Sequence, residues 1–452
     1  MKTYSKQARR VLMLSWEFPP RVIGGIARHV DELSRALVRA GVEVDVLTAH
    51  HPGAPAEEEL APGLRVLRAG PAPVEPADFI GEIHQLDFAL LERFLSYQRK
   101  SLSYQEYDLI HAHEWLVGFA ARSLRFGLDV PLVATVHATE SGRNGGIHTR
   151  MQHYIQSVEW MLSYDAWRVI CCSHAMADEV ERVLRVPADK VQVIPNGVDA
   201  KRLRCKSSAA ELARFRRRWA RDDERIVLFV GRLVREKGVE ILIDALPEVL
   251  SAHPGAKLVV AGGGAQEHLA ARARGRGLGQ KVAFTGFVSE DLARLYAIAE
   301  VAVFPSLYEP FGIVALEAMA AGVPVVASDV GGLREVVTHG VTGIHTWASN
   351  AHSLAWGIKQ VLADGALAAR LRRKARQEVI ERFHWDGIAE QTTSVYEEAL
   401  ALARAPAEEA VLDVESAPVY RRTPAPEAVG PGIRPRYLVT AQAEVVGAAA
   451  RS

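Results

Sequence analysis

The stretch VAVFPSLYEPFGIVALEAMAAGVPVVASDVGG, residues 301–332, contains a complete strand–helix–strand unit. Apolar residues dominate Val301–Pro305 and Val323–Ser328, which predicts two strands buried on both faces. Between them, a segment rich in good helix formers begins near Gly312 and ends at Gly322, and Pro324 opens the next strand. Two buried strands joined by a helix indicate an α/β fold with a parallel sheet.

The same alternation of short apolar runs and helical patterns extends over residues 10 to about 345 in two series. In the first series we predict strands at Val11–Ser15, Glu43–Thr48, Leu64–Arg68, Asp108–His113, Leu132–His137, Arg168–Ser173 and Val191–Pro195. In the second series we predict strands at Arg225–Val230, Lys257–Ala261, Val282–Thr285, Val301–Pro305, Val323–Ser328 and Gly343–Thr346. A charged segment without a strand pattern, residues 199–223, separates the series. Two doubly wound domains are therefore expected, each with a crevice at the carboxyl ends of its strands.

The resulting division has an N-terminal Rossmann-like domain at residues 1–200 and a C-terminal one at residues 201–383. A closing helix at 384–403 is expected to cross back to the first domain. Residues 404–452 are rich in Pro, Ala and charge, which predicts a disordered tail with one short strand at Tyr437–Ala441.

Composition excludes several classes of protein. The 452 residues include 54 Lys+Arg and 54 Asp+Glu, so no basic excess is present to bind nucleic acid as the main partner. No apolar run reaches the roughly 18 residues of a membrane span, and MKTYSKQARR has no secretory apolar segment. We therefore expect a soluble cytoplasmic protein, with Cys171 and Cys172 as thiols of the core.

Two segments that follow predicted strands can bind an anion. In SWEFPPRVIGGIARHV, residues 15–30, Gly24 and Gly25 open a helix, so the backbone can approach a ligand closely; a tight turn without a ligand is the alternative. In VGRLVREKG, residues 230–238, Arg232 and Lys237 leave a buried strand and can hold a diphosphate, unless they simply form a solvated helix start.

A third segment lies in the stretch quoted first. Glu309 is in the loop after a strand and Glu317 is on the next helix, so both can accept hydrogen bonds from sugar or ribose hydroxyls. The amides near Phe311, Gly312 and Ile313 add donors at the helix N-terminus. Glu317 could equally be an ordinary carboxylate of an amphipathic helix.

Together, GGIARHV, VGRLVREKG and EPFGIVALEAMAAGVPVVASDVGG resemble the retaining glycosyltransferases of family 4, the glycogen synthase and sucrose synthase type, over about residues 10–400. The resemblance implies the GT-B architecture, in which two Rossmann-like domains face a cleft and the C-terminal domain holds most of a nucleotide-sugar. By position, Arg232 and Lys237 would bind the donor diphosphate. Glu309 would contact the donor sugar, and Glu317 the ribose.

Further roles follow from the same resemblance. Gly24 and Gly25 would approach the phosphates from the opposite domain, and His137 in TVHATE would lie beside the anomeric carbon. Gly263 in VVAGGG and Phe287 in FTGF would form walls around the base.

The acceptor side is expected around LIHAHEW and HATESGRN. There we place His113, Glu114, Trp115 and Glu140. His111 and His113 point to the same side of a strand, as two zinc ligands can, but the sequence shows no evident third ligand.

The implied activity is retaining transfer of a hexosyl, chiefly glucosyl, unit from a nucleotide-diphosphate sugar to a hydroxyl of an α-glucan. Val22 stands where bacterial glycogen synthases carry the lysine of Lys-x-Gly-Gly, so mannosyl or glucosyl transfer to a small sugar, sugar phosphate or lipid stays open. A catalytically inactive sugar-nucleotide-binding regulator is the non-enzyme alternative. An NAD-dependent enzyme is disfavoured because the first glycine loop lacks dinucleotide spacing.

No metal or other cofactor is expected. The sequence has no Asp-x-Asp loop after a strand, and Arg232 with Lys237 would neutralise the diphosphate instead. The expected partners are a nucleotide-sugar donor and a carbohydrate acceptor, with no nucleic acid and no transmembrane segment, while peripheral membrane contact stays open.

Overall fold

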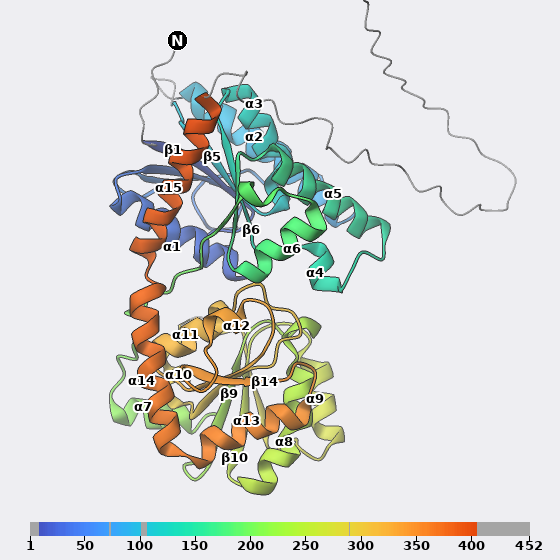
Figure 1. Cartoon of the computed structure of the whole chain (residues 1–452), viewed down its shortest axis with the longest axis vertical. Helices are drawn as coiled ribbons and strands as arrows, with labels where there is room; N and C mark the ends of the chain where they lie inside the picture. The colour runs from blue at the N-terminus through green and yellow to red at the C-terminus, as the bar shows by residue number, and fades with distance from the viewer. Residues whose placement is uncertain (1–8, 72–73, 101–105, 289, 405–452) are drawn as a thin grey trace, which may run out of the picture. The chain divides into compact units, whose positions relative to one another are not determined.

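A computed structural model describes residues 9–71, 74–100, 106–288 and 290–404 (Figure 1). The predicted tail, with its strand at Tyr437–Ala441, lies outside these residues except for Arg404. We call residues 10–193 together with the last helix the N-lobe, and residues 209–382 the C-lobe. Each lobe is built on its own sheet.

The N-lobe sheet has eight strands in the order β3-β4-β2-β1-β5-β6-β7-β8. These are β1 (Arg10–Ser15), β2 (Glu43–Thr48), β3 (Glu57–Ala61), β4 (Leu64–Arg68), β5 (Leu109–His113), β6 (Leu132–Val136), β7 (Arg168–Cys171) and β8 (Val191–Val193). Its helices are α1 (Gly25–Arg39), α2 (Phe79–Lys100), α3 (Gly118–Leu128), α4 (Glu140–Asn144), α5 (Arg150–Asp165) and α6 (His174–Leu184), with 3-10 turns η1 (Trp115–Val117) and η2 (Ala188–Lys190). All of these strand pairings are parallel except β3 with β4.

The C-lobe sheet has six parallel strands in the order β11-β10-β9-β12-β13-β14. These are β9 (Arg225–Val230), β10 (Ala256–Ala261), β11 (Val282–Gly286), β12 (Val301–Phe304), β13 (Val325–Ser328) and β14 (Gly343–Thr346). The helices are α7 (Ala209–Arg216), α8 (Val239–Ala252), α9 (Gln266–Gly275), α10 (Leu292–Ile298), α11 (Ile313–Ala321), α12 (Leu333–Val336), α13 (Ala351–Ala363) and α14 (Gly365–Arg382), with a 3-10 turn η3 (Arg235–Lys237).

Each sheet has one point where the strand order reverses. In the N-lobe the chain builds outward from β1 to β4 and then restarts on the other side of β1 with β5. In the C-lobe it builds from β9 to β11 and restarts beside β9 with β12. Loops diverge at such a point and leave a crevice at the carboxyl ends of the strands, so ligand-binding residues are expected after β1, β5, β9 and β12.

The last helix, α15 (Trp385–Arg404), returns to the N-lobe and packs against α1. Figure 1 shows these two helices side by side. Ile388 and Tyr396 of α15 are fully buried in a core cluster shared with β1 and α1. The chain therefore crosses between the lobes twice, and the crossings touch, because the Val198 amide donates to the Phe383 carbonyl at 2.9 Å.

The predicted strands are confirmed: β2, β4, β9 and β14 match at both ends, and the other predicted strands differ by one or two residues. β7 ends at Cys171 because Ser173 instead caps α6, accepting from the Met176 amide at 3.1 Å. Cys171 and Cys172 are buried as expected. Within the described segments, no helix is long and apolar enough to cross a membrane.

The strand β3 was missed by the sequence reasoning. Its sequence EEELA has no apolar run, because it is a charged edge strand that pairs antiparallel with β4. Charge on an edge strand keeps it from pairing with other chains, and it also hides the strand from a search for buried apolar runs.

Candidate active site

Lys237 and Glu309 meet at the point where the strand order of the C-lobe reverses. Lys237 ends the turn after β9 and Glu309 is in the loop after β12, and the Lys237 Nζ donates to Glu309 Oε2 at 2.6 Å. Ser306 Oγ donates to the same oxygen at 3.2 Å. The two charged side chains are only 16% and 8% exposed, so they attract each other with little screening by water. Sequence reasoning named both residues but did not foresee that they pair.

Two glycines let neighbouring loops approach the Glu309 loop closely. Gly238 follows Lys237 with φ of 66°, and a Cβ there would lie 2.0 Å from the Pro305 carbonyl oxygen. Gly331 has φ of 45°, and a Cβ there would lie 2.3 Å from the Glu309 carbonyl oxygen. Both positions combine a left-handed backbone with a close backbone neighbour. A side chain at Gly238 would push the Lys237 loop away from the loop after β12, and one at Gly331 would push the loop after β13 away from Glu309.

Arg232 lies at the same edge of the sheet but does not join the buried pair. Its side chain is 49% exposed and its guanidinium pairs with Glu236 at 3.2 Å. An exposed pair of this kind contributes little to stability, so Arg232 is free to exchange Glu236 for an incoming anion at small cost.

Glu317 forms an ion pair across the two lobes. This carboxylate is buried on α11, and its Oε1 accepts from the guanidinium of Arg28 on α1. Tyr296 donates to its other oxygen at 3.3 Å. Arg28 was not singled out by sequence reasoning. The sequence signal that could have identified Arg28 is its position, a cation in the first turn of the helix that Gly24 and Gly25 open.

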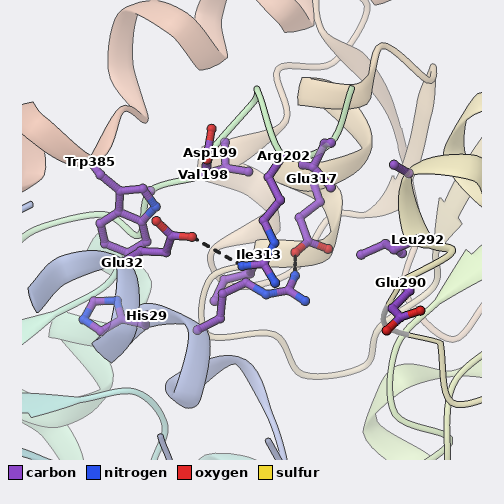
Figure 2. A pocket seen from close by; sticks show the side chains of 14 residues that line it. His29, Glu32, Val198, Asp199, Arg202, Glu290, Leu292, Ile313, Glu317 and Trp385 are labelled. Atoms are coloured by element: carbon purple, nitrogen blue, oxygen red, sulfur yellow. Dashed lines mark hydrogen bonds and ion pairs between the residues drawn. The ribbon is translucent and has the colours of Figure 1, made fainter. Parts of the chain in front are cut away.

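A cavity of about 210 Å³ lies beside this ion pair, between α1, residues 197–203 and α11. Figure 2 shows Glu32, Arg202 and Glu317 around it, with His29 and Trp385 on one side. The cavity is smaller than the roughly 300–1,000 Å³ typical of small-molecule sites. A ligand of nucleotide size would therefore have to move the side chains that now fill the space.

The glycine loop after β1 faces α11 of the other lobe. A Cβ on Gly25 would lie 2.9 Å from Ile313 Cδ1. The amides of Ile23 and Gly24 donate to the buried carboxylate of Glu17, at 2.7 and 2.8 Å. Glu17 thus already uses two of the donors that sequence reasoning offered to an anion, so a phosphate would have to approach from Gly25 onward.

His137 follows β6 and is partly buried, with its Nε2 3.2 Å from Nδ1 of His113. Burial is the main cause that lowers the pKa of His137 well below its usual value, so the imidazole is neutral at pH 7. Glu114 holds the backbone here, because its Oε1 accepts from the amides of His137 and Ala138, at 2.6 and 2.9 Å. Glu114 has φ of 69°, a strained conformation for this residue type.

The residues expected on the acceptor side lie mostly behind the surface. His113, Glu114 and Trp115 are all buried, and Trp115 packs against Phe79 with ring centroids 6.1 Å apart. They can position His137 but do not offer their side chains to solvent. Trp115 is covered by α2 and α5, while the ring of His113 packs against those of His29, His111 and His137. Glu140, at the start of α4, is half-buried and can be reached.

The buried carboxylate of Glu159, on α5, accepts a hydrogen bond at the first residue of α4. Its Oε1 accepts from the Glu140 amide at 2.7 Å. Burial, and then the charge of Glu114, raise the pKa of Glu159 to about 9, so it is protonated at neutral pH. Sequence reasoning did not select Glu159, since a single carboxylate on a helix carries no signal of burial.

The remaining predicted donor residues have mixed environments. A Cβ on Gly263 would meet no described atom within 4 Å, and the Phe287 ring is 69% exposed, so both are open to a ligand. Phe311 is buried against Phe383, with ring centroids 6.1 Å apart, so only its backbone can face a donor. Gly312, with φ of 106°, precedes α11, which begins at Ile313 as the sequence predicts.

The chain matches two families of known proteins. The family described as Glycosyltransferase Family 4 matches residues 23–202, and the family described as Glycosyl transferases group 1 matches residues 213–378.

Individual proteins match over most of their length. The chain is 40% identical over 397 residues to an uncharacterized glycosyltransferase of Methanocaldococcus jannaschii, covering 87% of this chain and 99% of that protein. It is 38% identical over 399 residues to a glycogen synthase of Mycobacterium tuberculosis, covering 86% and 94%. Among solved structures, sucrose-phosphate synthase from Thermosynechococcus elongatus has a TM-score of 0.75 and 30% identity, covering 87% of this chain and 100% of that one.

Proposed function

Because this chain belongs to the family 4 glycosyltransferases and has the GT-B fold, we propose that it transfers a glucosyl unit from a nucleotide-diphosphate sugar to a hydroxyl of an α-glucan, with retention at the anomeric carbon. The observation that carries the proposal is the Lys237–Glu309 ion pair, in which the carboxylate is buried and the lysine is partly buried. The pair brings together a cation and a carboxylate that can accept hydrogen bonds from sugar hydroxyls. It lies where the strand order of the C-lobe sheet reverses, which is the place where α/β sheets bind ligands.

The donor is bound by residues of both lobes in this proposal. Lys237 and Arg232 neutralise the diphosphate, while Glu309 accepts hydrogen bonds from the sugar. Glu317 accepts from the ribose, which requires the Arg28 guanidinium to leave it. Arg28 then lies next to the nucleotide as a cation supplied by the N-lobe.

The difficult step is departure of the nucleotide diphosphate as positive charge develops on the sugar. Lys237 is already in place at this point, so it can stabilise the leaving oxygen without reorganising. His137, being neutral, can share a hydrogen bond with the sugar without adding charge. We assign proton removal from the acceptor to the leaving phosphate, on the same face of the sugar. No donor-side residue needs to form a covalent bond in this route.

An α-glucan acceptor is favoured because the glycogen synthase of Mycobacterium tuberculosis matches over almost its whole length. A sugar phosphate is the second candidate, supported by the 30% identity to a sucrose-phosphate synthase. Arg143 on α4 is exposed in the segment expected to face the acceptor, and its charge suits a phosphate.

The test is a mass-spectrometric screen of ADP-, UDP- and GDP-linked glucose and mannose against maltooligosaccharides and sugar phosphates. We expect a lengthened maltooligosaccharide whose new linkage is α by NMR. Lys237→Ala should abolish most of the product. The control is Lys359→Ala, because Lys359 pairs with Glu248 at 2.7 Å on the outside of the C-lobe. Donor binding without transfer to any acceptor would instead support a sugar-nucleotide-binding regulator.

The same assay tests the proposal that no metal is needed. Because Lys237 and Arg232 supply the positive charge, the rate should be nearly unchanged in EDTA. Abolition by EDTA with rescue by Mn²⁺ or Mg²⁺ would contradict this mechanism.

A further inference from the structure

Three histidines from three different elements converge where the lobes face each other. His29 is on α1, His113 ends β5 and His137 follows β6. Their ring centroids lie 4.8 to 5.5 Å apart, and one nitrogen of each ring lies within 4.8 Å of the others. The 3.2 Å between His113 Nδ1 and His137 Nε2 is close to the edge of a tetrahedral zinc site, which is about 3.3 Å for Zn–N bonds of 2.0–2.1 Å.

The ring nitrogens of this cluster are poorly satisfied. His29 is buried with Asn196 as a polar neighbour, yet neither of its ring nitrogens makes a hydrogen bond of good geometry with a described residue. Within the described part of the chain, Nδ1 of His113 and Nε2 of His137 have only each other as partners, and these are the two nitrogens that a bound ion would take over. The neighbouring His111 provides the contrast, because Tyr396 and Thr135 hold its two nitrogens at 2.8 and 2.7 Å. Buried polar atoms without partners in a native fold point to something that occupies the site.

We propose that His29, His113 and His137 form a binding site for a transition-metal ion of the zinc class, and that the bound ion inhibits sugar transfer. Three neutral imidazoles can each direct one lone pair at a shared ion, with the fourth position left to water or substrate. The inhibitory part rests on the proposed function, because an ion held by His137 withdraws that imidazole from the sugar. His111 is excluded as a ligand, since both of its nitrogens are already used.

The site can be reached and closed by small movements. His29 lines the cavity of about 210 Å³ between the lobes, and His137 is only partly buried, so an ion has an entry path. The widest nitrogen separation of 4.8 Å must shrink by about 1.5 Å to give tetrahedral geometry, which side-chain rotation can supply. A buried water molecule that bridges the same nitrogens is the competing occupant.

The binding test uses the full chain, treated with EDTA and then freed of it. Titration with Co²⁺ should give the visible absorption of a four-coordinate ion with nitrogen ligands at one equivalent, and Zn²⁺ should displace it. His29→Ala should weaken Co²⁺ binding by about 100-fold or more. Even the loss of a residue that only orients a metal ligand typically lowers metal affinity by about 10–100-fold. The control is His268→Ala, since His268 is an exposed histidine that pairs with Glu240; its affinity should match the wild type.

A second measurement does not depend on the variant folding. Crystals of the unmodified chain soaked in Zn²⁺ should show an anomalous peak between the three rings. Absence of that peak, or equal Co²⁺ affinity in His29→Ala, would overturn the site and favour a bridging water.

Inhibition is measured separately. Zn²⁺ should lower the rate of sugar transfer by the wild type, EDTA should restore it, and the relative loss should be much smaller in His29→Ala, with each chain compared to its own metal-free rate. If Zn²⁺ binds between the rings without slowing transfer, the inhibitory role is wrong. If the chain transfers no sugar at all, the proposed function fails while the metal titration still decides the site.

Discussion

Replacing Lys237 with alanine should reduce both stability and activity, by separate amounts that the structure allows us to assign. The variant loses the cation that donates to Glu309 at 2.6 Å. The Glu309 carboxylate, whose side chain is 8% exposed in the unmodified protein, then has no charged partner at this position. Removing one partner of a buried ion pair costs about 3–5 kcal/mol. We expect about 3 kcal/mol, the lower end, because Lys237 is partly exposed and Ser306 still donates to Glu309. The rate of sugar transfer should fall by about 10²-fold or more, as for other lost transition-state donors.

The assay pairs thermal and urea unfolding with initial rates for Lys237→Ala, Lys237→Met with Glu309→Gln, and the control Lys359→Ala. A loss of about 3 kcal/mol corresponds to roughly 6–12 °C in the midpoint of a domain of this size. The double variant should recover most of the stability, because no charge is left unpaired, and should stay inactive. A Lys237→Ala protein with wild-type stability would refute the burial argument. Near-normal turnover would refute the role of Lys237 in the reaction.

Three other variants test separate parts of the structure. His137→Ala should lower kcat far more than it weakens donor binding measured by calorimetry, since its contact with the sugar is expected mainly in the transition state; equal kcat would reduce this histidine to packing. Gly238→Ala should destabilise the protein by several kcal/mol, about 3 or more, because the new Cβ would lie 2.0 Å from a backbone oxygen, whereas Gly275→Ala, with open space around it, should be neutral or slightly stabilising. Burial raises the pKa of Asp87 to about 7 from 3.8, so the native state holds this proton more tightly and stability falls as pH rises between these values. In the Asp87→Asn variant, the free energy of unfolding should lose the part of its decrease with pH that Asp87 causes. Urea unfolding at pH 4, 5.5 and 8 measures this, and a pH dependence equal to that of the wild type would contradict the assignment.

Local sequence was sufficient for the elements and for part of the site. Buried parallel strands read as unbroken apolar runs, so β2, β4, β9 and β14 match their predicted bounds at both ends. Lys237 and Glu309 were identified because each follows such a strand, and the topology then places the two strand ends side by side.

The relations between distant segments could not be derived in this way. The partner of Glu317 is Arg28, 289 residues away, and depends on how the lobes pack. His29 looks like an ordinary helix residue until the fold brings β5 and β6 against α1. The burial of Trp115 was also hidden, because nothing in LIHAHEW shows that α2 and α5 cover it.

The double crossing between the lobes limits how they can move. Two segments connect the lobes, one near Val198 and one near Phe383. Because the Val198 amide donates a hydrogen bond to the Phe383 carbonyl, the two segments form one connection between the lobes. Gly197 presses against Trp385 so closely that a Cβ would lie 2.7 Å from the indole, which leaves this strap little room to slide. We therefore expect the two lobes to move relative to each other by rotation about this one connection. The Arg28–Glu317 ion pair joins the lobes across the cavity, so under the proposed function the donor nucleotide has to break this pair before the ribose can reach Glu317.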